Sequence, residues 1–311
     1  MPRPRGTPCT ARRSPAAPAL RYLAGVTSLR IATCLTLPEP DPDAEPLDEA
    51  LRAAGVQAAL LGWDDPSVDW SAPVPTLLRT TWNYALAPQQ FLQWVDQVSA
   101  VAPLWNPASV VRGNVHKRYL LQLAERGVPT VRTLLVERGQ RLELAHALAH
   151  FGCSRLVVKP AIGAGSLDTE RFTAEQPEAA ARFAAHVAHL TSRGEALVQP
   201  FVDSVADYGE RSMVWIDGEL SHAIRKAPRF TGDDERIEGP MPIAQDEREL
   251  AHAALATLDQ DVLYARVDMA RDAGGRPQVM ELELIEPSLF FARRPGSAAR
   301  LVSGLLRRLR R

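Results

Sequence analysis

Alternating hydrophobic and polar positions divide the first third of the chain into short strands and helices. Apolar runs of strand length occur at residues 28–35, 56–63 and 75–82, and amphipathic helical patterns occur at 47–55 and 87–101. Strands that alternate with helices through short loops are typical of a parallel sheet covered by helices. We therefore predict that residues 29–113 form an N-terminal parallel α/β domain.

The middle of the chain follows a similar but shorter pattern. Asn114 is expected to cap a helix that runs to Arg126, where Gly127 and Pro129 end it. Strands are predicted at 130–137, 154–161 and 195–202, with helices at 140–151 and 176–192 between them.

The last third is predicted to contain two hairpins and two helices. One hairpin spans 211–227 and turns at Asp217–Gly218, and the other spans 263–284 and turns near Gly274–Gly275. A polar loop is expected at 228–242, a helix at 245–258, and a basic helix at 297–311. We expect the charged face of that last helix to be solvated and not to anchor the chain in a membrane.

Acidic residues interrupt an apolar strand in the sequence VMELELIEPSLFF at 279–291. Side chains alternate along a strand, so Glu281 and Glu283 share a face and Glu286 is expected on the other. If the hairpin turns symmetrically, Asp268 lies opposite Glu281 and Arg266 lies opposite Glu283. The resulting repulsion can be relieved by a shared proton, by a divalent cation such as Mg²⁺, or by solvent and nearby arginines.

Candidate phosphate-binding residues lie in the sequence RLVVKPAIGAGS. Lys159 ends a predicted strand, and Gly163, Gly165 and Ser166 follow it in a loop whose backbone N–H groups can approach phosphate oxygens. The spacing matches neither the P-loop nor the dinucleotide-binding motif. The chain has three lysines in all, at 117, 159 and 226, and each lies near a loop or the end of a predicted element.

Composition limits the function classes. The 311 residues carry a formal net charge of -1, which favours neither nucleic-acid nor membrane binding. Cys9, Cys34 and Cys153 form no metal-binding or disulfide pattern, so a cytoplasmic location is expected. Residues 1–28 are basic and rich in proline, and we interpret them as a disordered tail in preference to a targeting signal.

Taken in order, several motifs between Leu29 and Phe291 resemble the ATP-grasp superfamily. They are HKRYLL, LVVKPAIGAGS, ALVQPFV, GERSMVWIDGELSHAIRK, ARVDM and MELELIEPS. The last is similar to the metal-binding strand of the glutathione-synthetase type, with Glu283 where the pattern has asparagine. Within the superfamily, RTTWNY, LWNP and the Glu-Leu-Glu ending look most like the cyclo-ligase of cycloserine biosynthesis, an O-ureido-D-serine cyclo-ligase, and its relatives.

The resemblance implies an α/β fold of three parts with ATP bound between the last two. After the N-terminal domain, residues 114–198 would form a small antiparallel lid and residues 199–311 a C-terminal sheet domain. It also implies a homodimer as a possible state. The activity would be an ATP-dependent carboxylate–amine ligase that forms an acyl phosphate from a small amino-acid-like substrate and releases ADP and phosphate.

The resemblance also implies a role for each candidate residue. Lys117, Lys159, Gly163, Gly165 and Ser166 would contact the phosphates of ATP, and Gln199, Pro200, Phe201 and Val202 would hold adenine. Asp268, Glu281 and Glu283 would bind one or two Mg²⁺ ions, with Mn²⁺ as an alternative. Arg211 and Arg225 would stabilise the transferring phosphoryl group, and Arg79, Trp82, Asn83 and His222 would face the substrate.

Three readings of these patterns remain open. A small-molecule kinase would use the same residues but keep the phosphate on a stable product. A non-catalytic ATP-binding module would bind nucleotide without releasing ADP. For Arg79 and Trp82, packing at a domain interface is the alternative to substrate contact.

Overall fold

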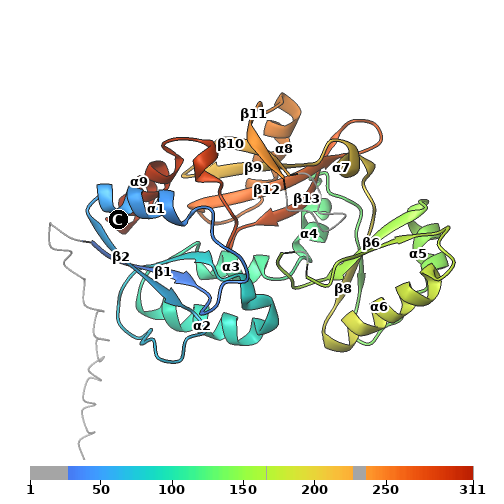
Figure 1. The fold of residues 1–311 in the computed structure, drawn as a ribbon, viewed down its shortest axis with the longest axis horizontal. Helices are drawn as coiled ribbons and strands as arrows, with labels where there is room; N and C mark the ends of the chain where they lie inside the picture. Colours follow the sequence, from blue (N-terminus) through green and yellow to red (C-terminus); the bar gives the residue numbers. More distant parts are fainter. Residues whose placement is uncertain (1–26, 166, 227–235, 311) are drawn as a thin grey trace, which may run out of the picture.

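The computed structural model describes residues 27–165, 167–226 and 236–310, whose strands form three sheets (Figure 1). The N-terminal sheet is parallel, as predicted, and has the strand order β2-β1-β3-β4. Its elements are β1 (Thr27–Thr33), α1 (Ala44–Ala53), β2 (Val56–Gly62), β3 (Thr76–Thr80), a 3-10 helix (Trp82–Leu86), α2 (Pro88–Val101) and β4 (Leu104–Trp105). The short strand β4 was not predicted.

The middle sheet is antiparallel and lies at the end of the molecule opposite α1 and β2 (Figure 1). Its elements are β5 (Leu134–Val136), α5 (Leu144–Phe151), β6 (Arg155–Pro160), β7 (Glu170–Thr173), α6 (Ala179–Arg193) and β8 (Ala196–Pro200). The order is β5-β8-β6-β7, and β7 was not predicted. Leu156, Val158 and Phe172 pack under α5 and α6 in one buried cluster, so the alternate residues Val157 and Lys159 point to the other face.

The C-terminal sheet is antiparallel with the order β11-β10-β9-β12-β13. Its elements are α7 (Asp203–Asp207), β9 (Glu210–Ile216), β10 (Glu219–Lys226), β11 (Ile237–Met241), α8 (Gln245–Leu255), β12 (Tyr264–Arg271), β13 (Pro277–Glu283), a 3-10 helix (Phe291–Arg293) and α9 (Ser297–Leu309). Asp217 and Gly218 both have positive φ and form the predicted turn. The prediction of a loop at 228–242 is wrong for residues 237–241, which form the edge strand β11. This strand has few apolar residues, so the sequence pattern did not indicate it.

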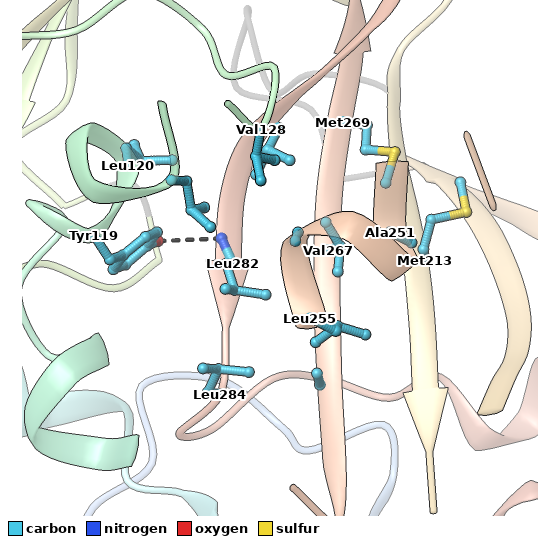
Figure 2. Close-up of a cluster of buried hydrophobic side chains, with 14 of the residues drawn as sticks. Tyr119, Leu120, Val128, Met213, Ala251, Leu255, Val267, Met269, Leu282 and Leu284 are labelled. Carbon is cyan, nitrogen blue, oxygen red and sulfur yellow. Dashed lines mark hydrogen bonds between the residues drawn. The ribbon is translucent and has the colours of Figure 1, made fainter. Parts of the chain in front are cut away.

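One core binds α4 (Tyr119–Glu125) and α8 to this sheet (Figure 2). Figure 2 shows Leu255 and Ala251 of α8 over Val267 of β12, with Leu120 on the α4 side. The Tyr119 hydroxyl accepts a hydrogen bond from the backbone N–H of Leu282 at 3.2 Å. The helices therefore cover one face of the sheet. The other face carries the polar side chains near β13 and, farther along, Val214, Ile216 and Ile224, which pack in a second core with α1 and α9.

The predicted N-cap at Asn114 is wrong, because Asn114 is the last residue of a separate helix, α3 (Ala108–Asn114). Its amide donates to the carbonyl of Leu282 at 2.7 Å and accepts from the N–H of Leu284 at 2.9 Å. The Asn114 side chain thus makes the backbone hydrogen bonds that a neighbouring strand would make at the end of β13. The chain then bends before α4 begins. This bend carries Lys117, whose backbone N–H donates to the carbonyl of Ala161 at 2.7 Å.

The segment after β13 joins the C-terminal sheet to the N-terminal sheet. Asp43, fully buried before α1, accepts hydrogen bonds from the backbone N–H groups of Leu289, Phe290 and Phe291 and from the guanidinium of Arg79. A buried carboxylate with this many donors is fully compensated. Across the described ranges, no helix combines the length and apolar character that a membrane crossing requires.

Candidate active site

The acidic strip is formed by β12 and β13 in the predicted register. Asp268 pairs with Glu281 and Arg266 pairs with Glu283, and a bulge follows Asp268. Directly paired residues on neighbouring antiparallel strands share a face. The three predicted carboxylates therefore lie on one face of the sheet. The predicted symmetric turn is wrong, because Arg271 pairs with Pro277, one residue out of that register, and the bulge after Asp268 restores the expected pairing.

Two cations neutralise Asp268. Its oxygens accept from the Arg266 Nε at 2.9 Å and from the Lys226 Nζ at 2.9 Å. Burial alone would raise the pKa of Asp268, but Arg266 and Lys226 outweigh it and hold that pKa well below its usual range. Arg266 also pairs with Glu283, and Lys226 pairs with Glu210. Asp268 is therefore ionised and firmly held.

Glu281 meets the two lysines predicted to bind phosphate. Its carboxylate lies 2.9 Å from the Lys117 Nζ and 4.0 Å from the Lys159 Nζ. Burial would lower the pKa of Lys117, but Glu281 reverses the direction and raises it. For Lys159 burial prevails, and its pKa is lowered. Two buried ammonium groups thus point at one carboxylate, in a place where a polyphosphate could replace it as their partner.

The glycine loop lies against the same group of side chains. The Lys117 Nζ donates to the carbonyl of Gly163 at 2.5 Å. A Cβ at Gly163 would approach the ring of Pro160 to 3.0 Å, and Gly165 has a φ of +61°, which favours glycine. The structure therefore brings this loop together with Lys117, Lys159 and Glu281. Ser166 lies outside the described residues.

The predicted adenine-binding segment leaves the middle sheet at the end of β8. The Gln199 side chain is buried and donates to the Thr133 hydroxyl at 2.8 Å. Pro200 ends the strand, and the Phe201 N–H bonds to the carbonyl of Arg155 at 2.9 Å. Val202 precedes α7, which leads into the C-terminal sheet. These four residues therefore lie where the chain leaves the middle sheet for the C-terminal sheet.

The structure does not bring Arg211 and Arg225 to the acidic strip. Both lie on the face covered by α8, since Arg211 pairs across the strands with Arg225 and with Met269 of the core. Arg211 makes two buried hydrogen bonds to Glu247 of α8, at 3.0 and 2.9 Å. Arg225 pairs with Glu238 of β11. Lys226 is the basic residue of β10 whose side chain reaches the acidic strip.

The four substrate candidates lie apart from the acidic strip or are already bonded. Arg79 is 1% exposed and donates to Asp43 and to the carbonyl of Pro287, so it packs at the interface between the sheets. Asn83 bonds to Trp63 and Asp64, and the His222 ring is buried beside the backbone of Leu289 and Phe290. Trp82 is half-buried, and its indole N–H donates to the carbonyl of Glu286 at 3.1 Å.

Glu286 lies near the acidic strip, although alternation along the strand excluded it. β13 ends at Glu283, so the alternating rule no longer applies three residues later. Burial raises the pKa of Glu286 to about 8, and the neighbouring Glu283 adds to the rise while Lys117 opposes it. Burial likewise raises the pKa of Glu283 to about 7 and that of Glu210 to about 8. The end of the strand was the signal that could have identified Glu286.

The side chains of the acidic strip fit Mg²⁺ by their chemistry, because carboxylate oxygens are its preferred ligands. Each of Asp268, Glu281 and Glu283 is now paired with lysine or arginine. Within the ranges that the structure describes, no three acidic, histidine or cysteine side chains converge closely enough to hold a metal ion. A Mg²⁺ ion here would therefore take one or two carboxylates together with oxygens of the nucleotide.

Comparison with known proteins decides the family. A family model described as the N-terminal domain of D-cycloserine synthetase DcsG matches residues 29–106. The cycloserine biosynthesis protein DcsG of Streptomyces lavendulae is 36% identical over 288 residues, which cover 87% of this chain and 95% of that protein. This chain belongs to the D-cycloserine synthetase family of ATP-grasp ligases. The crystal structure of D-cycloserine synthetase DcsG has a TM-score of 0.82 at 35% identity and matches over 91% of this chain and 99% of its own.

More distant structures share the fold of this D-cycloserine synthetase relative. D-alanine–D-alanine ligase from Bacillus anthracis, solved with ATP, has a TM-score of 0.63 at 16% identity, over 90% of this chain and 96% of that one. The ATP-grasp ligase PsnB in complex with a minimal precursor has the same TM-score, 0.63, at 16% identity, over 90% of this chain and 99% of that one. The ATP-grasp fold and the assignment as an ATP-dependent C–N ligase, both predicted from the sequence, are confirmed.

The raised pKa of Glu286 predicts a pH-dependent effect of Glu286→Gln on stability. Between pH 4.5 and about 8 the folded protein keeps a proton on Glu286 that the unfolded chain releases, so this group lowers stability as pH rises. Glutamine removes that dependence. We expect the variant to gain stability over the wild type at pH 8.5 and to match it closely at pH 4.5. Urea unfolding at the two pH values measures the difference, and an equal gain at both would contradict the prediction.

Proposed function

We propose that this ligase phosphorylates the carboxylate of a small amino-acid-like substrate with ATP and joins the resulting acyl phosphate to an amine. The proposal rests on one observation above all. Glu281, Lys117, Lys159 and the carbonyl of Gly163 meet at one point between the middle and C-terminal sheets. Buried cations beside a glycine loop and a strip of carboxylates suit a metal-bound nucleoside triphosphate.

In this proposal the residues around the acidic strip and the glycine loop keep the roles that were predicted for them from the sequence. Lys117 and Lys159 bind phosphate oxygens, the loop with Gly163, Gly165 and Ser166 covers them, and the backbone at Gln199–Val202 holds adenine. One or two of the carboxylates of Asp268, Glu281 and Glu283 would hold each Mg²⁺ ion, which when bound neutralises phosphate charge. Arg266 and Lys226 fix the position of Asp268 throughout.

The chemistry proceeds in two balanced steps. A substrate carboxylate oxygen attacks the γ-phosphorus of ATP, and the bond from that phosphorus to the ADP oxygen breaks. The amine nitrogen then attacks the acyl carbon, the bond from that carbon to the phosphate oxygen breaks, and the nitrogen loses a proton. Both steps depend on positioning and charge neutralisation, so a protein nucleophile is not required.

A ring-forming reaction is the first candidate, since the relative that matches nearly the whole chain is named D-cycloserine synthetase. In that case, the amine and the carboxylate belong to one molecule. Ureido- and hydroxy-amino acids are therefore the first compounds to test, followed by amino acids in pairs.

A metabolite screen for Mg·ATP-dependent ADP release tests the proposal. Equimolar ADP and free phosphate support a ligase. ADP without free phosphate indicates the kinase alternative. Nucleotide binding by calorimetry without ADP release from any compound indicates the non-catalytic module.

Lys226 and Arg225 are neighbours on β10 that face opposite sides of the sheet, so they provide a matched comparison. We expect Lys226→Met to lower ADP release on the order of 10²-fold, because Asp268 and Glu210 lose a shared cation. We expect Arg225→Met to have a smaller effect, since its partner is Glu238. Steady-state rates at saturating Mg·ATP measure both, and the reverse order would restore Arg225 as the phosphate-stabilising cation.

A further inference from the structure

The backbone after β13 is held in place by side chains from two directions. The carbonyl of Ile285 accepts from the Tyr264 hydroxyl at 2.8 Å, and the carbonyl of Glu286 accepts from the Trp82 indole at 3.1 Å. The carbonyl of Pro287 accepts from the guanidinium of Arg79 at 2.9 Å. Three consecutive carbonyls are thus bonded to buried or half-buried donors, and these bonds hold the backbone at Glu286 in position.

The Glu286 carboxylate differs from its neighbours in having no partner. Each other acid of the site has a cation within ion-pair distance: Glu210, Asp268, Glu281 and Glu283. Glu286 is 8% exposed and forms no hydrogen bond or ion pair through its carboxylate with any residue of 27–165, 167–226 or 236–310. A buried carboxylate without a partner is costly, so this group keeps its proton, and a bound cation would favour its ionised form.

The surroundings indicate what kind of ligand that is. The carboxyl of Glu286 interacts electrostatically with Glu283, Lys117 and Glu281, and the Glu286 backbone is bonded to Trp82 of the first domain. Burial raises the pKa of Tyr84, and Glu286 adds to that rise. Glu286 therefore lies between the acidic strip and the first domain, within the electrostatic reach of Lys117. A group that donates hydrogen bonds and carries positive charge would be stabilised there, and an anion would be repelled.

We propose that Glu286 binds the ammonium group of the substrate and so selects amino-acid-like compounds. This proposal rests on the proposed ligase function. With the ammonium at Glu286, the rest of the substrate can extend along the acidic strip, and its carboxylate can reach the phosphate held by Lys117 and Lys159. Glu286 does not belong to the metal-binding group in this arrangement, because β13 ends before it and its backbone is bonded to Trp82.

Glu286→Gln tests the proposal with two compounds, an O-ureido-serine and its des-amino counterpart. In the variant we expect the KM for the ammonium-bearing compound to rise at least about 30-fold, since one partner of a buried charge pair is lost. The KM for ATP should stay within about twofold, and the des-amino compound should react equally slowly with both proteins. Glu286→Asp should give an intermediate KM, and Glu219→Gln, whose target is exposed and pairs with Arg300, should change nothing.

Two results would overturn the assignment. One is an equal rise in KM for both compounds, and the other is a rise in the KM for ATP as large as that for substrate. If the wild type releases ADP with no compound, the proposed function fails. Glu286 is then judged by calorimetric titration of the same two compounds in the presence of Mg²⁺ and a non-hydrolysable ATP analogue. Equal affinity of wild type and variant for the ammonium-bearing compound, including no binding by either, would refute the role.

Discussion

Replacing Glu281 with alanine is expected to lower substrate-dependent ADP release on the order of 10²- to 10³-fold. Glu281 lies 2.9 Å from the ammonium of Lys117, 4.0 Å from that of Lys159, and opposite Asp268 on the neighbouring strand. The substitution removes a proposed metal ligand and leaves two buried cations without their present partner. Initial rates of ADP formation across a Mg²⁺ titration measure the effect.

Glu281→Gln separates charge from shape at the same position. We expect this variant to lose nearly as much activity, because an amide oxygen is a weaker ligand for Mg²⁺ than a carboxylate. Circular dichroism and thermal unfolding should show that both variants are folded. If Glu281→Ala kept wild-type turnover at every Mg²⁺ concentration, the metal assignment would be wrong.

Replacing Asp43 with alanine is expected to destabilise the fold by about 3–5 kcal/mol. The carboxylate accepts hydrogen bonds from three successive backbone N–H groups at Leu289–Phe291 and from Arg79, and both charged groups are almost completely buried. Removing one partner leaves Arg79 as a buried charge without compensation. Urea unfolding monitored by tryptophan fluorescence gives the difference in free energy.

Asp48→Ala is the matched control, because it removes an aspartate from α1, the helix that begins directly after Asp43. Asp48 pairs with Arg52 at 2.7 Å, but the two side chains are 61% and 68% exposed. An exposed pair of this kind contributes about 0.3–0.5 kcal/mol. Equal losses in the two variants would show that the Asp43 contacts do not stabilise the interface between the sheets.

The sequence predicted the pairing in the acidic strip correctly, but the rule behind the prediction was incomplete. A tight hairpin fixes which residues lie opposite each other, and alternation fixes which of them share a face. Next to the turn, however, Arg271 pairs with Pro277, so the loop has an odd length, and the bulge after Asp268 is what brings Asp268 opposite Glu281. The pairing was therefore predicted correctly although the turn was not, because the shift at the turn and the shift at the bulge cancel.

The role of Arg79 could not be predicted in this way. An arginine at the carboxyl end of a parallel strand occupies the place where open α/β sheets bind ligands, which favoured substrate contact. Its partners are Asp43 and the carbonyl of Pro287, and Pro287 is 208 positions away in sequence. Only the packing of the first sheet against the last segment makes it an interface residue, as the alternative reading held.

The two faces of β10 show another part of the site that the sequence could not predict completely. Alternation puts Arg225 and Lys226 on opposite faces, and that much could be read from the sequence. Which face is covered by α8 depends on how Leu250, Ala251 and Ala254 pack against the sheet, which is a property of the tertiary structure. Whether Arg225 or Lys226 faces the acidic strip depends on this packing, which cannot be read from the local sequence.

The way in which β13 is bordered has a consequence for assembly between copies of this chain. Pro129, Val131, Asn114 and Tyr119 occupy backbone groups along its outer side, and β11 at the opposite margin contains Pro240, which has no N–H to donate. Among the described residues, neither margin presents a continuous row of free donors and acceptors. Two molecules would therefore not associate by extending the C-terminal sheet from one to the other.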